Sequence, residues 1–445
     1  MAELIDTLTG LLADIPARSG RLNRYRQAYD GRSPSAYMSR ESRKAIDQRL
    51  NTLGVNYPRM YVRAVTDRLG ISGYRRQGAE ELDTRTWELW RTAGLTASAP
   101  LIHTDRLIYG NAYVTVWSHR DNPRQPVVML DSPLTANASI DPATGDTLAG
   151  VRMWETADGI RHALLMEPDH LTRWQGKRDV PPEHAGTWQL IEHLPNPWGR
   201  VPMVPFTRHE TADDIDGTSL LSDVLDLADG YAKVLQDAVV TSEYYARPRR
   251  WATGLEIEYD ENDEPRDPFG DSRFLQSEDP ETKFGQLNAA SLDGYKTLLD
   301  QFTAAIGSVT GLPPHYLGIY GNQPANAESI RASESQLVAQ AYTEQYGLDS
   351  PWSQVAGWLN AIADNLTDIP AGLLPRWEIP ETRTPAAEAD AALKLSTIGV
   401  PLRALLDQPL RYEPHQIKAI MDARRSDQIE AASLNALTGG TNGTR

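Results

Sequence analysis

The chain has 445 residues, enough for about three domains of average size, and it contains no cysteine, which excludes disulfide bonds, thiolate metal sites and cysteine nucleophiles. Its formal net charge of −16 argues against a role in coating DNA, because such proteins bind phosphates through Lys and Arg. The apolar runs are shorter than the roughly 20 residues that span a bilayer, and the first residues lack the features of a signal peptide, so we expect neither membrane insertion nor export.

The first hundred residues predict a series of helices. One covers Arg40 to Leu53, and Asn56 is a candidate N-cap for the next. That next helix carries an apolar stripe on one side: Tyr61, Val62, Val65 and Leu69. Two further helices are expected over residues 80–94 and 96–110.

From residue 111 to about residue 208 the sequence changes to short β-rich runs separated by turns. Asp158-Gly159 lies between two alternating runs and predicts a tight hairpin, and residues 142–145 predict another turn. The runs are AYVTVWSH, PVVMLDS, LAGVRMWET, GIRHALLME and HLTRWQ. Because strands and helices are segregated along the chain, we expect an α+β fold, mainly helical, with an antiparallel β meander.

Two long helices are expected next, over residues 218–247 and about 289–309. In both, apolar residues recur in alternating steps of three and four, which places them on one stripe of a helix. The polar segment between them contains an expected strand over Leu255–Tyr259 and an acidic turn. The pattern predicts a stalk of two helices with a small tip.

A loop rich in Gly and Pro follows the second long helix, with the sequence TGLPPHYLGIYGNQPAN. Gly311, Pro313 and Pro314 predict the end of that helix. The next helix is expected from about Asn326 to Tyr346, with an interruption at Gly347 and a new start at Ser350-Pro351, as one bent helix or as two helices in series.

The remaining chain, from residue 384 onward, predicts further helices and then a flexible tail, GGTNGTR. Trp352 and Trp358, on the helix that resumes after Ser350-Pro351, are most simply core and interface side chains.

The loop does not fit a nucleotide-binding P-loop. It has no lysine between Gly311 and Arg331, and a helix precedes it where the motif requires a strand. We therefore expect no nucleotide hydrolysis by this segment.

One segment could support a metal-dependent hydrolase, which is the alternative function. His209 and Glu210 begin a sequence that resembles a metalloprotease motif without its second histidine, and Asp213, Asp214 and Asp216 follow. The ligand spacing of a calcium loop is absent, so a polar connector is the simpler interpretation.

Two charged groups near the tip have similarly simple explanations. The acidic run at residues 260–264 has Pro265 where a calcium loop needs glycine, which favours a solvated turn. Arg247, Arg249 and Arg250 lie beside aromatic residues and could contact nucleic acid or an acidic partner, but favourable interaction with a helix C-terminus explains them equally well.

The order of these parts resembles the portal proteins of tailed double-stranded-DNA bacteriophages, of the siphophage type. The resemblance depends on LNRYRQAYDG with the helices after it, and on DGTSLLSDVLDLADGYAKVLQDAVVTSEYYARPRRWATG. The most specific block is FTAAIGSVTGLPPHYLGIYGNQPANAESIRASESQLVAQAYTEQYG, whereas the β meander and the C-terminal helices match only in general character.

The resemblance implies a portal fold with named parts. Residues 1–216 would form the wing with its helices and β meander, residues 217–247 and 288–310 the stem helices, and residues 248–287 a small α/β clip. Residues 311–325 would be the tunnel loop, 326–383 a kinked long helix and the return to the wing, and 384–445 crown-like helices with the flexible tail.

The resemblance also implies the residues that meet other molecules. The channel-facing tunnel loop would use Gly311, Pro313, Pro314, Tyr316, Gly318, Tyr320, Gly321, Asn322 and Gln323. The partner-docking clip would use Arg249, Arg250, Trp251, Asp260, Glu261, Asp263 and Glu264. No catalytic residue, cofactor or metal is expected.

The function implied by the resemblance is that of a homo-oligomeric ring, usually of twelve subunits, at the portal vertex of the virion capsid. Double-stranded DNA would pass through its channel during packaging and ejection, while a separate terminase hydrolyses ATP. Expected partners are the terminase large subunit, capsid and scaffolding proteins and the head–tail connector, with no membrane. Assembly would take place in the cytoplasm of the host bacterium.

Overall fold

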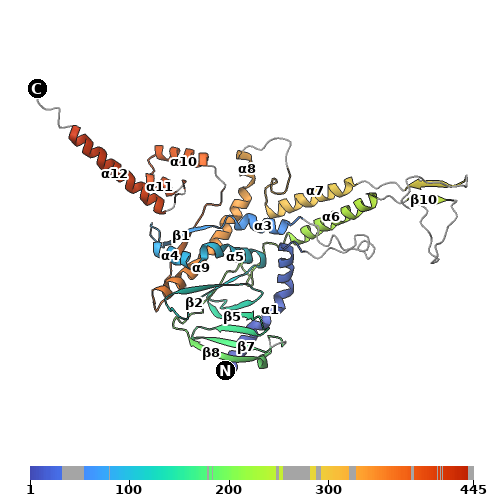
Figure 1. Ribbon diagram of the computed structural model, residues 1–445, viewed down its shortest axis with the longest axis horizontal. Coiled ribbons are helices and arrows are strands. Elements are labelled where there is room, and N and C mark those ends of the chain that lie inside the picture. Colours follow the sequence, from blue (N-terminus) through green and yellow to red (C-terminus); the bar gives the residue numbers. More distant parts are fainter. Residues whose placement is uncertain are drawn as a thin grey trace.

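In the computed structural model, helices and antiparallel strands form separate parts, and two long helices project to one side (Figure 1). The structure describes residues 1–32, 55–79, 81–177, 180–182, 184–246, 250–253, 281–286, 292–319, 327–381, 385–407, 409–410, 412 and 414–438. This segregation confirms the α+β class. No helix within these ranges is long and apolar enough to cross a membrane.

The β-rich part contains an antiparallel meander that includes three of the five predicted runs, LAGVRMWET, GIRHALLME and HLTRWQ, whereas AYVTVWSH and PVVMLDS lie in a second sheet. The five strands of the meander lie in the order of the sequence: β4 (Ala136–Ile140), β5 (Thr147–Glu155), β6 (Arg161–Met166), β7 (His170–Gly176) and β8 (Trp188–Pro195), with a 3-10 turn over Ala185–Thr187 before the last. Gly145 and Gly159 adopt positive φ angles in the first two hairpins, as the turn predictions require. The second sheet has the order β3-β2-β9, with β2 (Tyr113–Ser118), β3 (Pro126–Asp131) and β9 (Met203–Pro205).

The meander is covered on both faces. Helix α1 (Ala2–Tyr29) packs on one face, where Leu8 and Leu12 join a buried cluster with Val151, Leu165 and Trp174. The other face packs on the second sheet through a smaller cluster, whose members include Tyr113, Met166 and Met203. Alternate residues of the strands thus point to opposite apolar layers.

The main core lies among α3 (Tyr57–Thr66), α4 (Thr84–Thr92), α5 (Leu95–Tyr109) and α9 (Ser335–Ala363). Trp352 is fully buried at its centre, 4.8 Å from the ring of Trp90 and 4.7 Å from that of Phe206. Its indole N–H donates to His103 Nε2 at 2.8 Å. The core also includes Trp358, so both tryptophans are core residues, as expected.

The local signals in this core are also confirmed. Asn56 caps α3, since its side chain accepts a hydrogen bond from the backbone N–H of Arg59. A two-stranded sheet of β1 (Ile71–Arg76) and β12 (Leu373–Trp377) closes the core. The helix predicted over Arg40–Leu53 lies outside the described residues.

The two long helices lie side by side, as α6 (Leu225–Ala246) and α7 (Asp293–Thr310) (Figure 1). Gly230 permits close contact, because a Cβ there would lie 2.6 Å from the ring of Phe302. Beyond α6, β10 (Arg250–Thr253) pairs with β11 (Lys283–Gln286). The strand predicted over Leu255–Tyr259 falls outside the described residues.

The prediction that the first long helix begins at residue 218 is wrong, because residues 220–224 form turns and the helix begins at Leu225. The backbone N–H of Leu220 donates to the carbonyl of Leu107, and Ser219 Oγ donates to the carbonyl of Ile108. These bonds to the end of α5 hold the segment out of the helix, so tertiary contacts override a favourable local pattern.

The predicted interruption at Gly347 is also wrong. Helix α9 continues through Gly347 and Pro351, and the break lies at Glu334, between α8 (Ala327–Ser333) and α9. A Cβ at Gly347 would lie 2.7 Å from Nη2 of Arg106, so glycine is required there by packing. It does not end the helix.

The C-terminal part is helical, as predicted. It comprises α10 (Pro385–Thr397), α11 (Leu402–Asp407) and α12 (Pro414–Thr438), and α12 extends away from the rest of the chain (Figure 1). The predicted tail, from residue 439 onward, lies outside the described residues.

Two glycine substitutions test the packing role of Gly347. Gly347→Ala should lower the midpoint of thermal unfolding, because the new methyl group crowds the buried Arg106 at a cost of about 1–3 kcal/mol. The higher helix propensity of alanine contributes only roughly 0.5–1 kcal/mol in the opposite direction. Gly10→Ala in α1 is the matched control, since a Cβ there meets no atom within 4 Å, and it should raise the midpoint. A rise of equal size for both variants would contradict the packing role.

Candidate functional site

The segment after α7 turns sharply. Gly311 caps the helix in the left-handed region, with φ 65°, and its N–H donates to the carbonyl of Gly307. The helix end predicted from Gly311, Pro313 and Pro314 is thereby confirmed. The turn is closed by hydrogen bonds to the carbonyls of the two prolines, from the N–H groups of Tyr316, Leu317 and Ile319.

The first half of the loop is fixed to the protein body. Leu317 is buried against α7, where a Cβ at Gly307 would lie 2.6 Å from its side chain. Tyr316 Oη accepts a hydrogen bond from Arg68 Nη2 at 3.2 Å, and its ring packs edge-on against the ring of His315, 4.8 Å away. Gly318 and Ile319 are exposed, and the predicted loop residues Tyr320, Gly321, Asn322 and Gln323 lie outside the described residues.

Glu334 stands at the break between α8 and α9. Its buried carboxylate lies 3.7 Å from Arg68 Nη2 and 3.8 Å from His315 Nε2. Since Arg68 also binds Tyr316, one guanidinium links the loop to the helix break that follows it. Both sides of the loop therefore meet at Arg68.

A second buried ionic group lies further along α9. The Glu344 carboxylate forms ion pairs with Arg106 of α5 and, at 2.8 Å, with Nε of Arg208. Arg208 also donates to Glu210 and to the carbonyl of Thr218. Burial raises the pKa of the Glu344 carboxyl, but the two guanidinium groups outweigh it and hold that pKa below its ordinary value.

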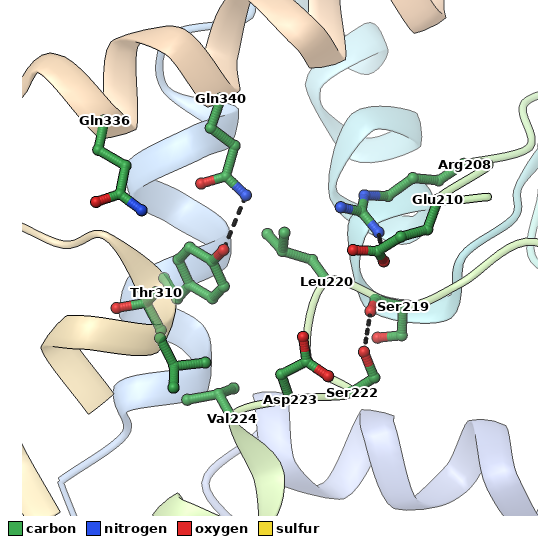
Figure 2. A pocket seen from close by; sticks show the side chains of 12 residues that line it. Arg208, Glu210, Ser219, Leu220, Ser222, Asp223, Val224, Thr310, Gln336 and Gln340 are labelled. Carbon is green, nitrogen blue, oxygen red and sulfur yellow. Dashed lines mark hydrogen bonds and ion pairs between the residues drawn. The ribbon is translucent and has the colours of Figure 1, made fainter. Parts of the chain in front are cut away.

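A polar cavity of about 210 Å³ lies beside these groups, where α6 starts and α7 ends. Figure 2 shows Gln336 and Gln340 of α9 on one side of it and Ser222 and Asp223 on the other. Gln340 donates to Tyr61 Oη at 2.8 Å. The polar groups around this cavity hold the helix ends together, and they form no arrangement of nucleophile and base.

The segment from His209 to Asp216 forms a closed turn. The Asp214 carboxylate accepts hydrogen bonds from the backbone N–H groups of Glu210 and Gly217 and from Thr218 Oγ1, and the His209 ring contacts the Asp214 carbonyl. Within the described ranges no three metal-ligating side chains gather. The hydrolase alternative, which used His209, Glu210 and the aspartates at positions 213 to 216, finds no support, because the Asp214 carboxylate is engaged in closing the connector.

The predicted partner-docking residues are only partly placed. Arg250 and Trp251 lie in β10, opposite Gln286 and Gly285 of β11. Five others fall outside the described residues: Arg249, Asp260, Glu261, Asp263 and Glu264.

Sequence reasoning missed the ionic residues of the body. Arg106 lies within α5 and directly precedes Leu107 and Ile108, so a charge beside apolar residues of an expected helix was a usable signal. No local pattern indicated that Glu344 would be its partner.

Comparison with known proteins gives one consistent result. The family described as "Phage portal protein, SPP1 Gp6-like" matches residues 11–429. The portal protein of Mycobacterium phage D29 is 31% identical over 404 residues, covering 86% of this chain and 81% of that protein. The portal protein of Mycobacterium phage L5 is 30% identical over 407 residues, with the same coverage.

Among solved structures, a chain from the virion of a native gene transfer agent particle matches with a TM-score of 0.48 and 12% identity, over 84% of this chain and 95% of that one. A chain from the neck of an empty particle of the same kind has a TM-score of 0.46, with the same identity and coverage.

The buried ion group predicts a pH-dependent loss of stability in Glu344→Gln. At neutral pH the variant should lose roughly 3–5 kcal/mol of unfolding free energy, because two guanidinium groups remain without their carboxylate. The folded-state pKa of Glu344 is lowered, so its contribution is present above the ordinary value of 4.5 and is lost as the pH falls through the folded-state value. The difference from the native protein should therefore shrink at acid pH.

Denaturant titrations across this pH range measure the effect. Glu88→Gln, at an exposed carboxylate of α4, is the matched control and should change stability by less than about 0.5 kcal/mol. A Glu344→Gln variant as stable as the control at neutral pH would show that the ion group contributes nothing.

Proposed function

The chain belongs to the SPP1 Gp6-like family of phage portal proteins, and from this membership we propose that it assembles into a closed ring through which double-stranded DNA enters and leaves a capsid. The family match over residues 11–429 is the observation that carries the proposal. The named relatives are portal proteins of two mycobacteriophages, and the alignment covers most of each.

The shape of the chain supports a ring subunit. Helices α6 and α7 project from the body as a pair, with the β10–β11 hairpin at the far end (Figure 1). Two large apolar side chains on α7, Leu298 and Val309, stay exposed in the single chain. Long helices with exposed apolar side chains suit packing against neighbouring copies.

We assign the parts of the portal accordingly. The wing comprises residues 1–216 and the stem comprises α6 and α7 within the segments 217–247 and 288–310. The clip is residues 248–287, the tunnel loop 311–325, the long helix with the wing return 326–383, and the crown 384–445. The observed order of helices, meander, paired helices and C-terminal helices supports this assignment.

The tunnel loop is proposed to face the channel with the exposed residues that follow its fixed first half. Gly318 and Ile319 leave the body there, and Tyr320 to Gln323 continue the segment. Leu317 and Pro313 are buried and hold the loop, so they belong to its support.

The proposed partners follow from the place of the ring in a virion. DNA lies in the channel, the terminase large subunit and the head–tail connector dock on the clip, and capsid and scaffolding proteins surround the wing. Assembly takes place in the host cytoplasm. The chain itself needs no catalytic site, and its charge of −16 limits non-specific attachment of DNA.

Ring formation tests this function directly. We expect size-exclusion chromatography with light scattering to give one large species, and negative-stain images to show closed rings with a central hole. The physical reason is that Leu298 and Val309 of α7, which are exposed in the single chain, would be buried against neighbouring copies. A strictly monomeric or dimeric protein at high concentration would contradict the proposal.

A deletion tests the tunnel loop. Removing Ile319 to Gln323 should leave rings intact and reduce packaging or retention of DNA, because the contacts of Tyr316 and Leu317 with the body remain. Packaging is measured as nuclease-protected DNA per capsid. Replacement of the same five residues by Gly and Ser is the control for length, and failure of the deletion variant to form rings would make the loop an assembly contact.

A further inference from the structure

A cavity of about 350 Å³ lies beside α3, at the point where the loop after α7 meets it. Three arginines line it, Arg59, Arg63 and Arg68, together with Tyr316 from the loop. In a chain with a net charge of −16, three guanidinium groups around one cavity are a local exception. The cavity is separate from the polar cavity at the start of α6.

Two of the three arginines are held in fixed positions. Arg59 donates from Nε to the carbonyl of Tyr29, and its guanidinium stacks over the Tyr29 ring, 5.0 Å from the ring centre. Arg68 donates from Nη1 to the carbonyl of Ala64 and from Nη2 to Tyr316 Oη. Its Nε is buried and has no hydrogen-bond partner in the part of the chain that the structure describes. Fixed guanidinium groups of this kind bind an anion without first losing side-chain freedom.

Arg63 is the third arginine of the lining. Its side chain is exposed and makes no hydrogen bond or ion pair with any residue that the structure describes. Arg63 lies four positions after Arg59, so both lie on the same face of α3.

Among the residues that the structure describes, the carboxylates near the cavity leave most of these arginine donors without a close acceptor. Asp30 Oδ1 lies 3.6 Å from Arg59 Nη2, and Glu334 Oε2 lies 3.7 Å from Arg68 Nη2. At these distances the carboxylates partly neutralise the guanidinium charges but do not form good hydrogen bonds. Asp67 is the one acidic residue of the lining itself. The cavity is therefore rich in donors and poor in acceptors, which complements a ligand with several acceptor oxygens.

We propose that this cavity binds a phosphate group, with Arg63 as its principal contact and Arg59 and Tyr316 beside it. Because Tyr316 Oη accepts its bond from Arg68, its own proton is available to the ligand. The phosphate is either a free anion or part of a phosphodiester backbone. The phosphodiester case rests on the proposed passage of DNA, whereas the free-anion case does not.

Calorimetric titration of the full-length protein with inorganic phosphate tests the site. Arg63→Gln should weaken phosphate binding about tenfold, since it removes charge-assisted hydrogen bonds. Arg91→Gln is the matched control, because Arg91 is an exposed arginine in the last turn of α4 and removes the same charge elsewhere; it should leave binding unchanged. Thermal unfolding of both variants verifies that they are folded.

Anisotropy titrations with a short labelled DNA duplex distinguish the two sources. If the site binds a phosphodiester, Arg63→Gln alone should bind the duplex more weakly. The dependence of its duplex affinity on salt concentration should also fall by about one phosphate contact. An unchanged duplex affinity beside weakened phosphate binding assigns the site to the free anion.

The proposal is overturned if the native protein binds phosphate without saturation or if the two variants change binding equally. Neither result depends on ring formation, which electron micrographs of the same samples report separately.

Discussion

The positions of α9 and α6 depend on one buried carboxylate. Glu344 of α9 is paired with Arg106 of α5 and with Arg208, which also binds the carbonyl of Thr218 just before α6. In a low-dielectric interior each of these charges is tolerated only while its partners stay in place. The same ionic group therefore fixes where α9 crosses the body and where the long helix α6 leaves it.

Buried contacts fix the chain on both sides of the loop that follows α7. On one side Gly311 ends α7 and Leu317 is buried against that helix. On the other side Glu334 lies at the start of α9, facing Arg68 and His315. Gly318 and Ile319, which follow Leu317, are exposed, so a portal ring built from this chain would combine fixed walls with a small exposed element at each subunit.

Local signals in the sequence predicted a large part of this fold. The alternating runs predicted strands β2, β3, β5, β6 and β7. Asn56 predicted the start of α3, and Gly311 predicted the end of α7. The errors came from tertiary contacts: bonds from Ser219 and Leu220 to α5 delay α6, and packing on Arg106 explains Gly347. The ionic groups join residues far apart in the chain, for which no local pattern exists, and the resemblance to phage portals is confirmed by the family match.

Electron cryomicroscopy of the assembled particle tests most directly the claim that α6 and α7 form the stem of a ring whose inner surface carries the loop after α7. The account predicts that copies of α6 and α7 surround a central axis and that residues Gly318 and Ile319 of every subunit point toward it. A ring in which these residues lie on the outer perimeter, or in which α6 and α7 make no contact between subunits, would contradict it.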